Sequence, residues 1–167
     1  LAPINVEDTF GVTVEAFNIA EQYQTPVIIL SDQEISQRKE AVPRIDTKKL
    51  TVVDRRKPNE SEMDPYVRYR LTESGISPIS HPGMKGGNYL AAGIEHTETG
   101  APTANGAMHA KMNDKRIRKL NPLKARADLF LRAGPVDAPI ALVAWGSVAG
   151  VVLETLRLAD AAGLRVK

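Results

Sequence analysis

The stretch Thr25-Pro26-Val27-Ile28-Ile29-Leu30-Ser31-Asp32 decides the fold class of this 167-residue chain. Its centre, Val27 to Leu30, is a continuous apolar run rich in β-branched residues, which is typical of a strand buried on both faces of a parallel sheet. A helix is predicted directly before it, over residues 5–24, with a short turn at Gln24–Pro26. A helix, a tight turn and a buried strand make most of a βαβ unit, so we predict an α/β fold whose first strand lies just before Leu1.

The predicted helix over residues 5–24 is apolar on two sides. Asn5 or Asp8 is its expected N-cap, and acidic residues in the first turn face the positive end of the helix dipole. One apolar face is spaced by three and four residues and consists of Val6, Phe10, Val14, Phe17 and Ala20. A second strip consists of Val12, Ala16 and Ile19. We therefore expect the helix to be covered on both sides.

A second strand and helix follow near the end of the chain. Pro139 to Trp145 repeats the buried-strand pattern, and Gly146-Ser147 leads into a helix predicted to run to Ala162. Gly163 then stands where a left-handed residue commonly ends a helix, and Leu164 to Val166 would begin a further strand. A new α/β domain is therefore predicted to begin near residue 139.

The intervening residues, about 33–138, lack a sustained period. Short strands are predicted at 50–53 and 66–71, and a helix at 105–120 that stops near Pro122. Such a length of irregular chain exceeds ordinary loops. We expect an interface-forming connection, not a third compact domain.

Composition excludes several classes of protein. The chain has no cysteine, so it holds no disulfide, thiolate zinc site or cysteine-ligated iron–sulfur cluster. Its net charge of +2 is too small to indicate nucleic acid or an anionic membrane, and no run approaches the ~20 apolar residues of a membrane span. A cytoplasmic location is expected. The chain begins without Met and stops where a strand is predicted to start, so we expect an internal fragment of a longer protein.

Several motifs, in order, carry a family resemblance. They are Val6–Phe10, Glu15–Glu21, Tyr23–Asp32, Gly75–Pro78, the glycines at 83, 86 and 87, Gly93–Gly100, and Lys115–Leu120. The chain resembles the alpha subunits of 2-oxoacid:ferredoxin oxidoreductases, and looks most like the 2-oxoglutarate type. The most specific block is Glu95-His96-Thr97-Glu98-Thr99-Gly100 with Arg116 and Arg118 downstream.

The resemblance implies a domain plan. Residues 1–34 would end a pyrimidine-binding α/β domain of the thiamine-diphosphate fold. Residues 35–138 would be the irregular interface-forming connection, and residues 139–167 the start of a truncated second α/β domain with a transketolase C-terminal-like fold.

The resemblance also implies a reaction, the oxidative decarboxylation of a 2-oxoacid, favouring 2-oxoglutarate, to acyl-CoA and CO2 with ferredoxin as electron acceptor. Thiamine diphosphate, an electron sink for the carbanion, and magnesium would lie between alpha and beta subunits, with an iron–sulfur cluster on a partner subunit. The expected partners are the beta subunit, ferredoxin, the 2-oxoacid and coenzyme A. The family's cofactor carboxylate and its Pro-Ile-Thr-Pro-like motif would precede Leu1. No residue here is therefore assigned as catalytic, cofactor-binding or metal-binding, and no cofactor is expected on this fragment alone.

Five residues are candidates for contact with substrate or a partner subunit: Asp32, Glu95, His96, Arg116 and Arg118. His96 lies between acidic residues in a glycine-rich loop, where it could transfer protons or, as we favour, fix the course of the loop. Asp32 follows a predicted strand at the end where α/β sheets place ligands, but aspartate there equally caps a helix or forms a turn.

Other features favour structural roles. His81 and His109 are expected to be solvated or turn residues, and Gly146–Gly150 lacks the spacing of a phosphate loop. Residues 111–132 hold eight Lys or Arg against Asp114 and Asp128, but without aromatic platforms for bases. A solvated face or subunit interface is favoured there, with coenzyme A phosphates or an acidic ferredoxin as open alternatives.

Two other classes of function compete with the enzyme subunit. A non-catalytic α/β scaffold or assembly module would keep the same pattern without a catalytic face. A nucleotide-binding Rossmann module would require a glycine fingerprint followed by an acidic residue about 20 positions later, and none is present.

Overall fold

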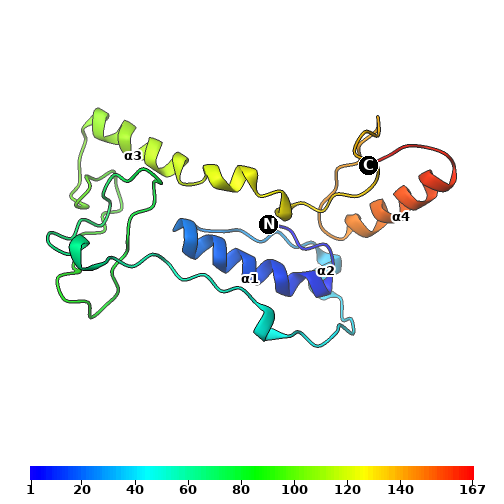
Figure 1. Ribbon diagram of the computed structural model, residues 1–167, viewed down its shortest axis with the longest axis horizontal. Coiled ribbons are helices and arrows are strands. Elements are labelled where there is room, and N and C mark those ends of the chain that lie inside the picture. Colours follow the sequence, from blue (N-terminus) through cyan, green and yellow to red (C-terminus); the bar gives the residue numbers. More distant parts are fainter. The chain divides into compact units, whose positions relative to one another are not determined.

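The computed structural model describes residues 1–167, which divide into two compact units (Figure 1). Unit 1 comprises Leu1–Ile19, Pro26–Val52 and Ala127–Lys167, and unit 2 comprises Ala20–Thr25 and Val53–Arg126. The α-helices are α1 (Val6–Tyr23), α2 (Gln33–Gln37), α3 (Gly106–Arg118) and α4 (Val148–Ala161). Short 3-10 helices are η1 (Thr47–Lys49), η2 (Glu60–Glu62), η3 (Asn121–Ala125) and η4 (Ala127–Leu129). The helices predicted over 5–24, 105–120 and up to 162 are confirmed.

Unit 1 contains a parallel pairing of extended segments on either side of α1. The Leu1 amino group donates to the Ile28 carbonyl at 2.9 Å, and the Leu30 N–H donates to the Leu1 carbonyl at 2.8 Å. Figure 1 shows the segment after α1 returning along the helix to the N-terminus. The predicted βαβ connection is therefore present, with Leu1 itself in the first extended segment.

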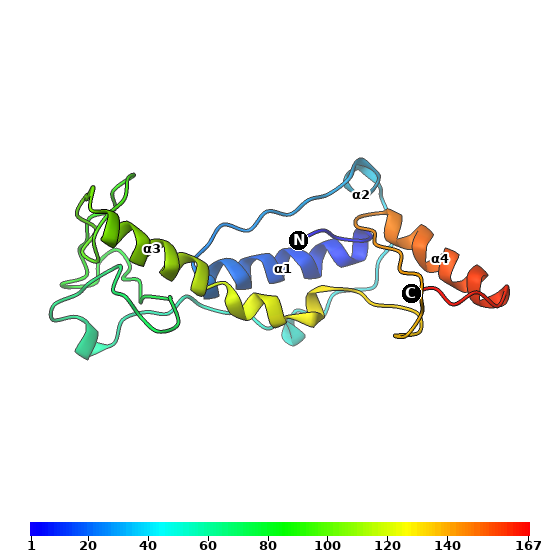
Figure 2. The ribbon, with the colours of Figure 1, turned by 90° about the horizontal axis from the view of Figure 1, so that it is seen from above.

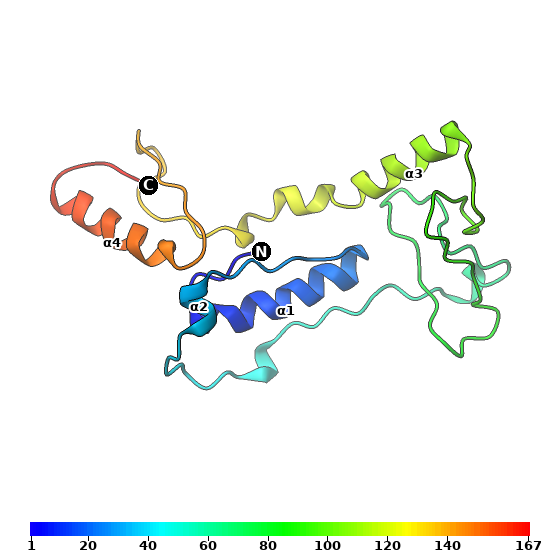
Figure 3. The same ribbon diagram turned by 180° about the vertical axis from the view of Figure 1, so that it is seen from behind.

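A second parallel pairing brackets α4. Ile140 and Val166 form a parallel bridge, and Lys167 donates to the Ile140 carbonyl at 2.9 Å. Figure 3 shows the C-terminal segment returning beside the chain that precedes α4. The predicted strand–helix–strand order is therefore observed, with Gly163 at φ +73° where α4 gives way to the returning segment.

The strand prediction is wrong for 27–30, 50–53, 66–71 and 139–145, because none of these stretches forms a regular ladder and 66–71 contains a turn at Arg68 and Tyr69. Pairing is confined to isolated bridges, of which the antiparallel ones are Met63–Tyr66 and His96–Pro102. Burial was also predicted wrongly, since Ile28 is 72% exposed and Val143 96% exposed. An extended segment becomes a buried strand only when neighbours pair along its length and cover its faces, and these 167 residues do not supply them.

α1 buries one of its two predicted strips. Ala16 and Ile19 are buried, whereas Phe17, on the other apolar face, is 69% exposed. Asn18 is buried beside the covered strip and donates its amide to the Thr51 carbonyl at 2.9 Å. The covering on both sides that the sequence predicted is therefore absent from unit 1.

Unit 2 is built around α3, and Figure 2 shows loop segments gathered at the N-terminal half of this helix. Asn105 caps it, accepting a hydrogen bond from the Met108 N–H at 2.9 Å. Met112, which is 1% exposed, is its central buried side chain. No helix of the structure is both long and apolar enough to cross a membrane.

Candidate functional site

The glycine-rich block that the sequence singled out is a short hairpin. Thr103 donates to the Glu95 carbonyl at 2.9 Å and Thr97 to the Ala101 carbonyl at 2.8 Å, so the chain reverses between them. Gly100 completes the turn at φ +90°, a left-handed conformation that glycine adopts without strain. Glu98 at the tip accepts backbone N–H groups from Tyr69 and Leu71, which fixes the hairpin to the chain beside it.

Glu95 joins this hairpin to α3. Arg116 donates to both of its carboxylate oxygens, at 2.7 and 3.1 Å, and the His109 Nδ1–H donates to one of them at 2.6 Å. The Arg116 guanidinium, the His96 backbone N–H and His109 together hold the pKa of the Glu95 carboxyl well below its usual range. Asn113 completes the network, accepting from Arg116 at 3.1 Å and donating to His109 Nε2 at 2.8 Å.

The helical spacing of α3 explains this meeting. His109, Asn113 and Arg116 are four and then three residues apart, so they share one face of the helix. Glu95 is 18% exposed, while Arg116 is 42% and His109 58% exposed. The network is therefore a partly solvated anchor, fixed by a carboxylate that is itself mostly covered.

His96 faces the interior of unit 2 rather than Glu95. Its Nδ1–H donates to the Thr97 carbonyl at 2.9 Å, and its ring lies 4.0 Å from the Tyr69 ring centroid at 40°. Both contacts hold the ring in place, and the choice between fixing the loop and transferring protons stays a prediction.

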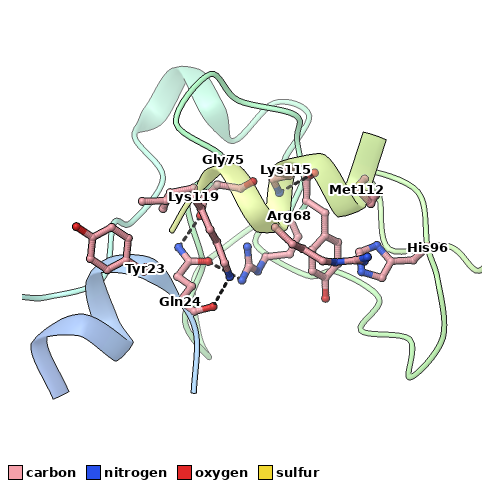
Figure 4. Close-up of a pocket in the computed structure, with 12 residues that line it drawn as sticks. Tyr23, Gln24, Arg68, Gly75, His96, Met112, Lys115 and Lys119 are labelled. Atoms are coloured by element: carbon pink, nitrogen blue, oxygen red, sulfur yellow. Dashed lines mark hydrogen bonds between the residues drawn. The ribbon is translucent and has the colours of Figure 1, made fainter. Parts of the chain in front are cut away.

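A cavity of about 160 Å³ lies within unit 2, beside His96 (Figure 4). Its lining combines the end of α1, two loops, the hairpin and the C-terminal half of α3. The lining residues are Tyr23, Gln24, Arg68, Tyr69, Gly75, Ile76, Ser77, His96, Met112, Lys115, Arg116 and Lys119. Four of these residues are cationic and none is acidic.

Gln24 orients two of the cations. It has φ +48°, the one left-handed residue other than glycine, at a cost of about 1–2 kcal/mol. The Lys119 ammonium donates to its carbonyl at 2.8 Å and Arg68 to its side-chain oxygen at 2.8 Å, while its amide donates to the Ser77 carbonyl at 2.6 Å. Every partner of these cations at Gln24 is a neutral oxygen, as the dashed lines of Figure 4 show for Lys119.

Lys115 is the most deeply buried of the cations, at 7% exposure. Its ammonium donates to the Tyr69 carbonyl at 3.1 Å. Burial, with the positive charges of Arg68, Lys119 and Arg116 outweighing the negative charge of Glu98, lowers the pKa of Lys115 to about 8. Burial and the same arginines also lower the pKa of Lys119.

The remaining candidates have structural partners. Asp32 lies in unit 1, where it caps α2 by accepting from the Ile35 N–H at 3.0 Å and accepts from the Ser147 N–H at 2.7 Å. These backbone bonds lower the pKa of its carboxyl. Arg118 pairs with Asp114 and donates to the Glu73 carbonyl at 2.9 Å. The structure therefore brings Glu95, His96 and Arg116 together and leaves Asp32 and Arg118 apart from their network.

Sequence reasoning missed three parts of this site. His109, predicted to be solvated or a turn residue, is exposed but bonded to Glu95, and its shared face with Arg116 was a signal for this contact. Lys115 and Lys119 were counted only within a basic stretch, although their spacing of four residues places them on one side of the helix. Arg68 gave no signal, because its place depends on loops that no local pattern predicts.

The chain's family is shown by comparison with known proteins. Residues 1–115 match a family model described as "Pyruvate flavodoxin/ferredoxin oxidoreductase, thiamine diP-bdg". The chain therefore belongs to this family of thiamine diphosphate-binding domains.

Similar full-length proteins are more specific. The chain is 32% identical over 164 residues to the alpha subunit of 2-oxoacid:ferredoxin oxidoreductase 2 of Aeropyrum pernix, covering 96% of this chain and 25% of that protein. It is 29% identical to the 2-oxoglutarate synthase subunit KorA of Methanocaldococcus jannaschii, covering 99% of this chain and 43% of that protein. The chain thus spans a quarter to less than half of the curated relatives it matches.

A solved structure shares the fold. The 2-oxoglutarate:ferredoxin oxidoreductase from Magnetococcus marinus, with 2-oxoglutarate, coenzyme A and succinyl-CoA bound, matches with a TM-score of 0.89 and 35% identity. The match covers 99% of this chain and 29% of that chain.

The residues present do not by themselves fit thiamine diphosphate. The cavity of about 160 Å³ is well below the roughly 300–1,000 Å³ that encloses a ligand of cofactor size. A second hollow, along α2, is lined only by Gln33, Glu34, Gln37 and Arg38, without an apolar wall for a pyrimidine ring. No cofactor contact is therefore assigned to a residue of this chain.

Proposed function

We propose that this chain is part of the alpha subunit of a 2-oxoacid:ferredoxin oxidoreductase that acts on 2-oxoglutarate. The observation that carries the proposal is the match to the Magnetococcus marinus enzyme along 99% of the chain, at 35% identity and a TM-score of 0.89. The KorA relatives, which are named 2-oxoglutarate synthase subunits, support the same substrate.

The complete enzyme would decarboxylate the 2-oxoacid, pass the resulting electron pair to ferredoxin and transfer the acyl group to coenzyme A. Thiamine diphosphate supplies the electron sink when bound. Magnesium, the beta subunit and an iron–sulfur cluster on a partner subunit belong to the same proposal. Cytoplasmic location is part of it as well.

Within that enzyme, residues 1–34 would close the pyrimidine-binding domain and residues 139–167 would begin the transketolase C-terminal-like domain. The parallel pairings around α1 and α4 support these two assignments. Residues 35–138 would form an interface. The exposed apolar side chains at 27–30 and 139–145 would then be covered by further strands of each domain.

The role of unit 2 in this proposal is positional. The Glu95 network fixes the hairpin to α3, and the hairpin in turn holds the His96 ring against Tyr69. These residues would keep this part of the subunit rigid beside the substrates, without themselves transferring protons.

The test is turnover by the complete enzyme, purified with its partner subunits. We expect coenzyme A-dependent reduction of a viologen dye with 2-oxoglutarate, and at least about tenfold lower kcat/KM with pyruvate, since a site built for a second carboxylate loses that contact. Absence of turnover with every 2-oxoacid, in an assembly that is otherwise intact, would favour the non-catalytic scaffold instead.

A further inference from the structure

We propose that the cavity of unit 2 is a binding site for a small oxyanion, held by Arg68, Lys115 and Lys119. The ligand class is a carboxylate or phosphate group. The proposal concerns anion binding by these side chains and does not depend on the reaction of the complete enzyme.

The first observation is an excess of hydrogen-bond donors. A guanidinium has five N–H donors and an ammonium three. Arg68 bonds the Gln24 amide oxygen, Lys115 the Tyr69 carbonyl and Lys119 the Gln24 carbonyl, and none of the three forms an ion pair. Donors therefore remain available to a ligand.

The second observation is a donor that has no partner at all. Arg68 Nε is buried and unbonded. A buried N–H without an acceptor is rare in folded proteins, because its lost hydration is not replaced. The guanidinium cannot turn away to solvent without losing Gln24, and it lies 5.0 Å from the Tyr69 ring centroid. This N–H leaves the hydrogen bonding of the Arg68 guanidinium incomplete.

The third observation is the distribution of charge. Arg116, which also lines the cavity, is paired with the Glu95 carboxylate. The other three cations form no ion pair, and the Glu98 carboxylate, whose charge acts on Lys115, accepts a hydrogen bond from the Leu71 N–H. Burial lowers the pKa of Lys115 to about 8. A bound anion would favour the charged form of this ammonium and accept a hydrogen bond from it in a place shielded from water.

The size of the cavity sets the ligand class. The cavity volume of about 160 Å³ is many times the roughly 10–15 Å³ that a single water molecule needs. That is enough for a phosphate group or for a short carboxylate, and too little for a nucleotide. Of the substrates that we propose for the complete enzyme, a 2-oxoacid has carboxylates and coenzyme A has phosphates.

The experiment follows single lysines in the complete enzyme. Amines are acetylated with a trace reagent at pH 8 and constant ionic strength, with sodium chloride or with inorganic phosphate, and each lysine is quantified by peptide mass spectrometry. Phosphate should slow acetylation of Lys119 and Lys115 by about tenfold, because a charge-assisted bond withholds the amine. Lys111 is exposed on the same helix and should be unaffected, which provides an internal control.

Variants separate the site from general screening. Arg68→Gln should abolish the protection of both lysines, whereas Lys111→Gln should leave it unchanged. If Arg68→Gln loosens the fold, Lys119→Gln with Lys115 as the readout makes the same test, because Lys119 bonds only one carbonyl here. Circular dichroism of each variant checks that the fold is retained.

The outcome is decided by the pattern. Saturable protection of Lys115 and Lys119 that requires Arg68 supports the proposal, and competition by 2-oxoglutarate or by coenzyme A then assigns the carboxylate or the phosphate source. Protection equal to that of Lys111, or protection that survives Arg68→Gln, overturns it. Turnover is measured separately, so an inactive enzyme that still shows protection rejects the proposed function alone.

Discussion

Replacing Gly75 with alanine should loosen unit 2 at the contact between the cavity loop and α3. Gly75 has φ +77°, and an added Cβ would lie 2.6 Å from the Lys115 carbonyl and 2.9 Å from the Lys119 nitrogen. These are the two ends of a helical hydrogen bond, Lys119 N–H to Lys115 carbonyl at 3.2 Å, so neither atom can move without weakening the end of α3.

Two costs add in Gly75→Ala. The left-handed conformation costs a non-glycine residue about 1–2 kcal/mol. Forcing a methyl group into a packed contact costs about 1–3 kcal/mol more. Gly83 provides the matched control, because it has φ +87° but nothing within 4 Å of an added Cβ. Gly83→Ala should therefore show the conformational cost alone.

Hydrogen exchange of the complete protein, read by mass spectrometry, measures the difference locally. Peptides from α3 and residues 70–77 should exchange faster in Gly75→Ala than in Gly83→Ala by about 5- to 150-fold, the ratio that corresponds to about 1–3 kcal/mol. Gly75→Asn should exchange faster than wild type but less so than Gly75→Ala, because asparagine tolerates the left-handed region and keeps only the steric cost of its Cβ. Equal exchange in Gly75→Ala and Gly83→Ala would refute the close approach of this loop to α3.

Three further predictions concern the site. Glu95→Gln should speed hydrogen exchange of the hairpin by about tenfold, because charged hydrogen bonds become weaker neutral ones. As a control, Glu154→Gln, which removes an exposed i,i+3 ion pair, should change hydrogen exchange of α4 little. Hairpin exchange no faster than wild type would show that Glu95 is not an anchor. The free energy of unfolding of the complete protein, measured in urea, should rise by up to about 3 kcal/mol between pH 8 and 10.5 on account of Lys115. In this range the unfolded chain still binds the lysine proton, up to the ordinary pKa of 10.5, whereas the folded chain, with a pKa of about 8, has lost it. Lys115→Met should remove this part of the rise, and an unchanged difference between the two pH values would count against the prediction. His96→Gln should retain most of the turnover of the complete enzyme, and near-complete loss with assembly intact would instead indicate proton transfer.

The helices could be predicted from the sequence because their signals are local. The predicted span 105–120 became α3, Gly106–Arg118, with Asn105 as the cap, and the span 5–24 became α1, Val6–Tyr23. Strands depend on distant neighbours, so the run Val27–Leu30 indicated the correct parallel pairing but not its extent. It bonds to Leu1 and leaves Ile28 72% exposed, because no further segment of this chain reaches it.

The site was predictable to a lesser degree, for the same reason. The resemblance placed Glu95, His96 and Arg116 among the candidates, but nothing local could show that a carboxylate and a guanidinium 21 residues apart would meet. Asp32 shows the opposite case. Its position after an apolar run favoured a ligand site and a helix cap equally, and the bond from the Ile35 N–H identifies the cap.

The order of charges along α3 supports two different tasks for its last turns. Cations near a helix C-terminus are favoured by the dipole, and this explains why basic residues gather there. It does not explain their burial, since exposed cations gain the same interaction without losing hydration. Arg116 and Arg118 follow the expected rule, each with a carboxylate, Glu95 and Asp114. Lys115 and Lys119 depart from this rule, because like charges four residues apart repel, and here Lys115 is buried and Lys119 is partly buried. The helix itself does not require the unfavourable burial and repulsion of Lys115 and Lys119. Binding of a negative group in the cavity would offset both.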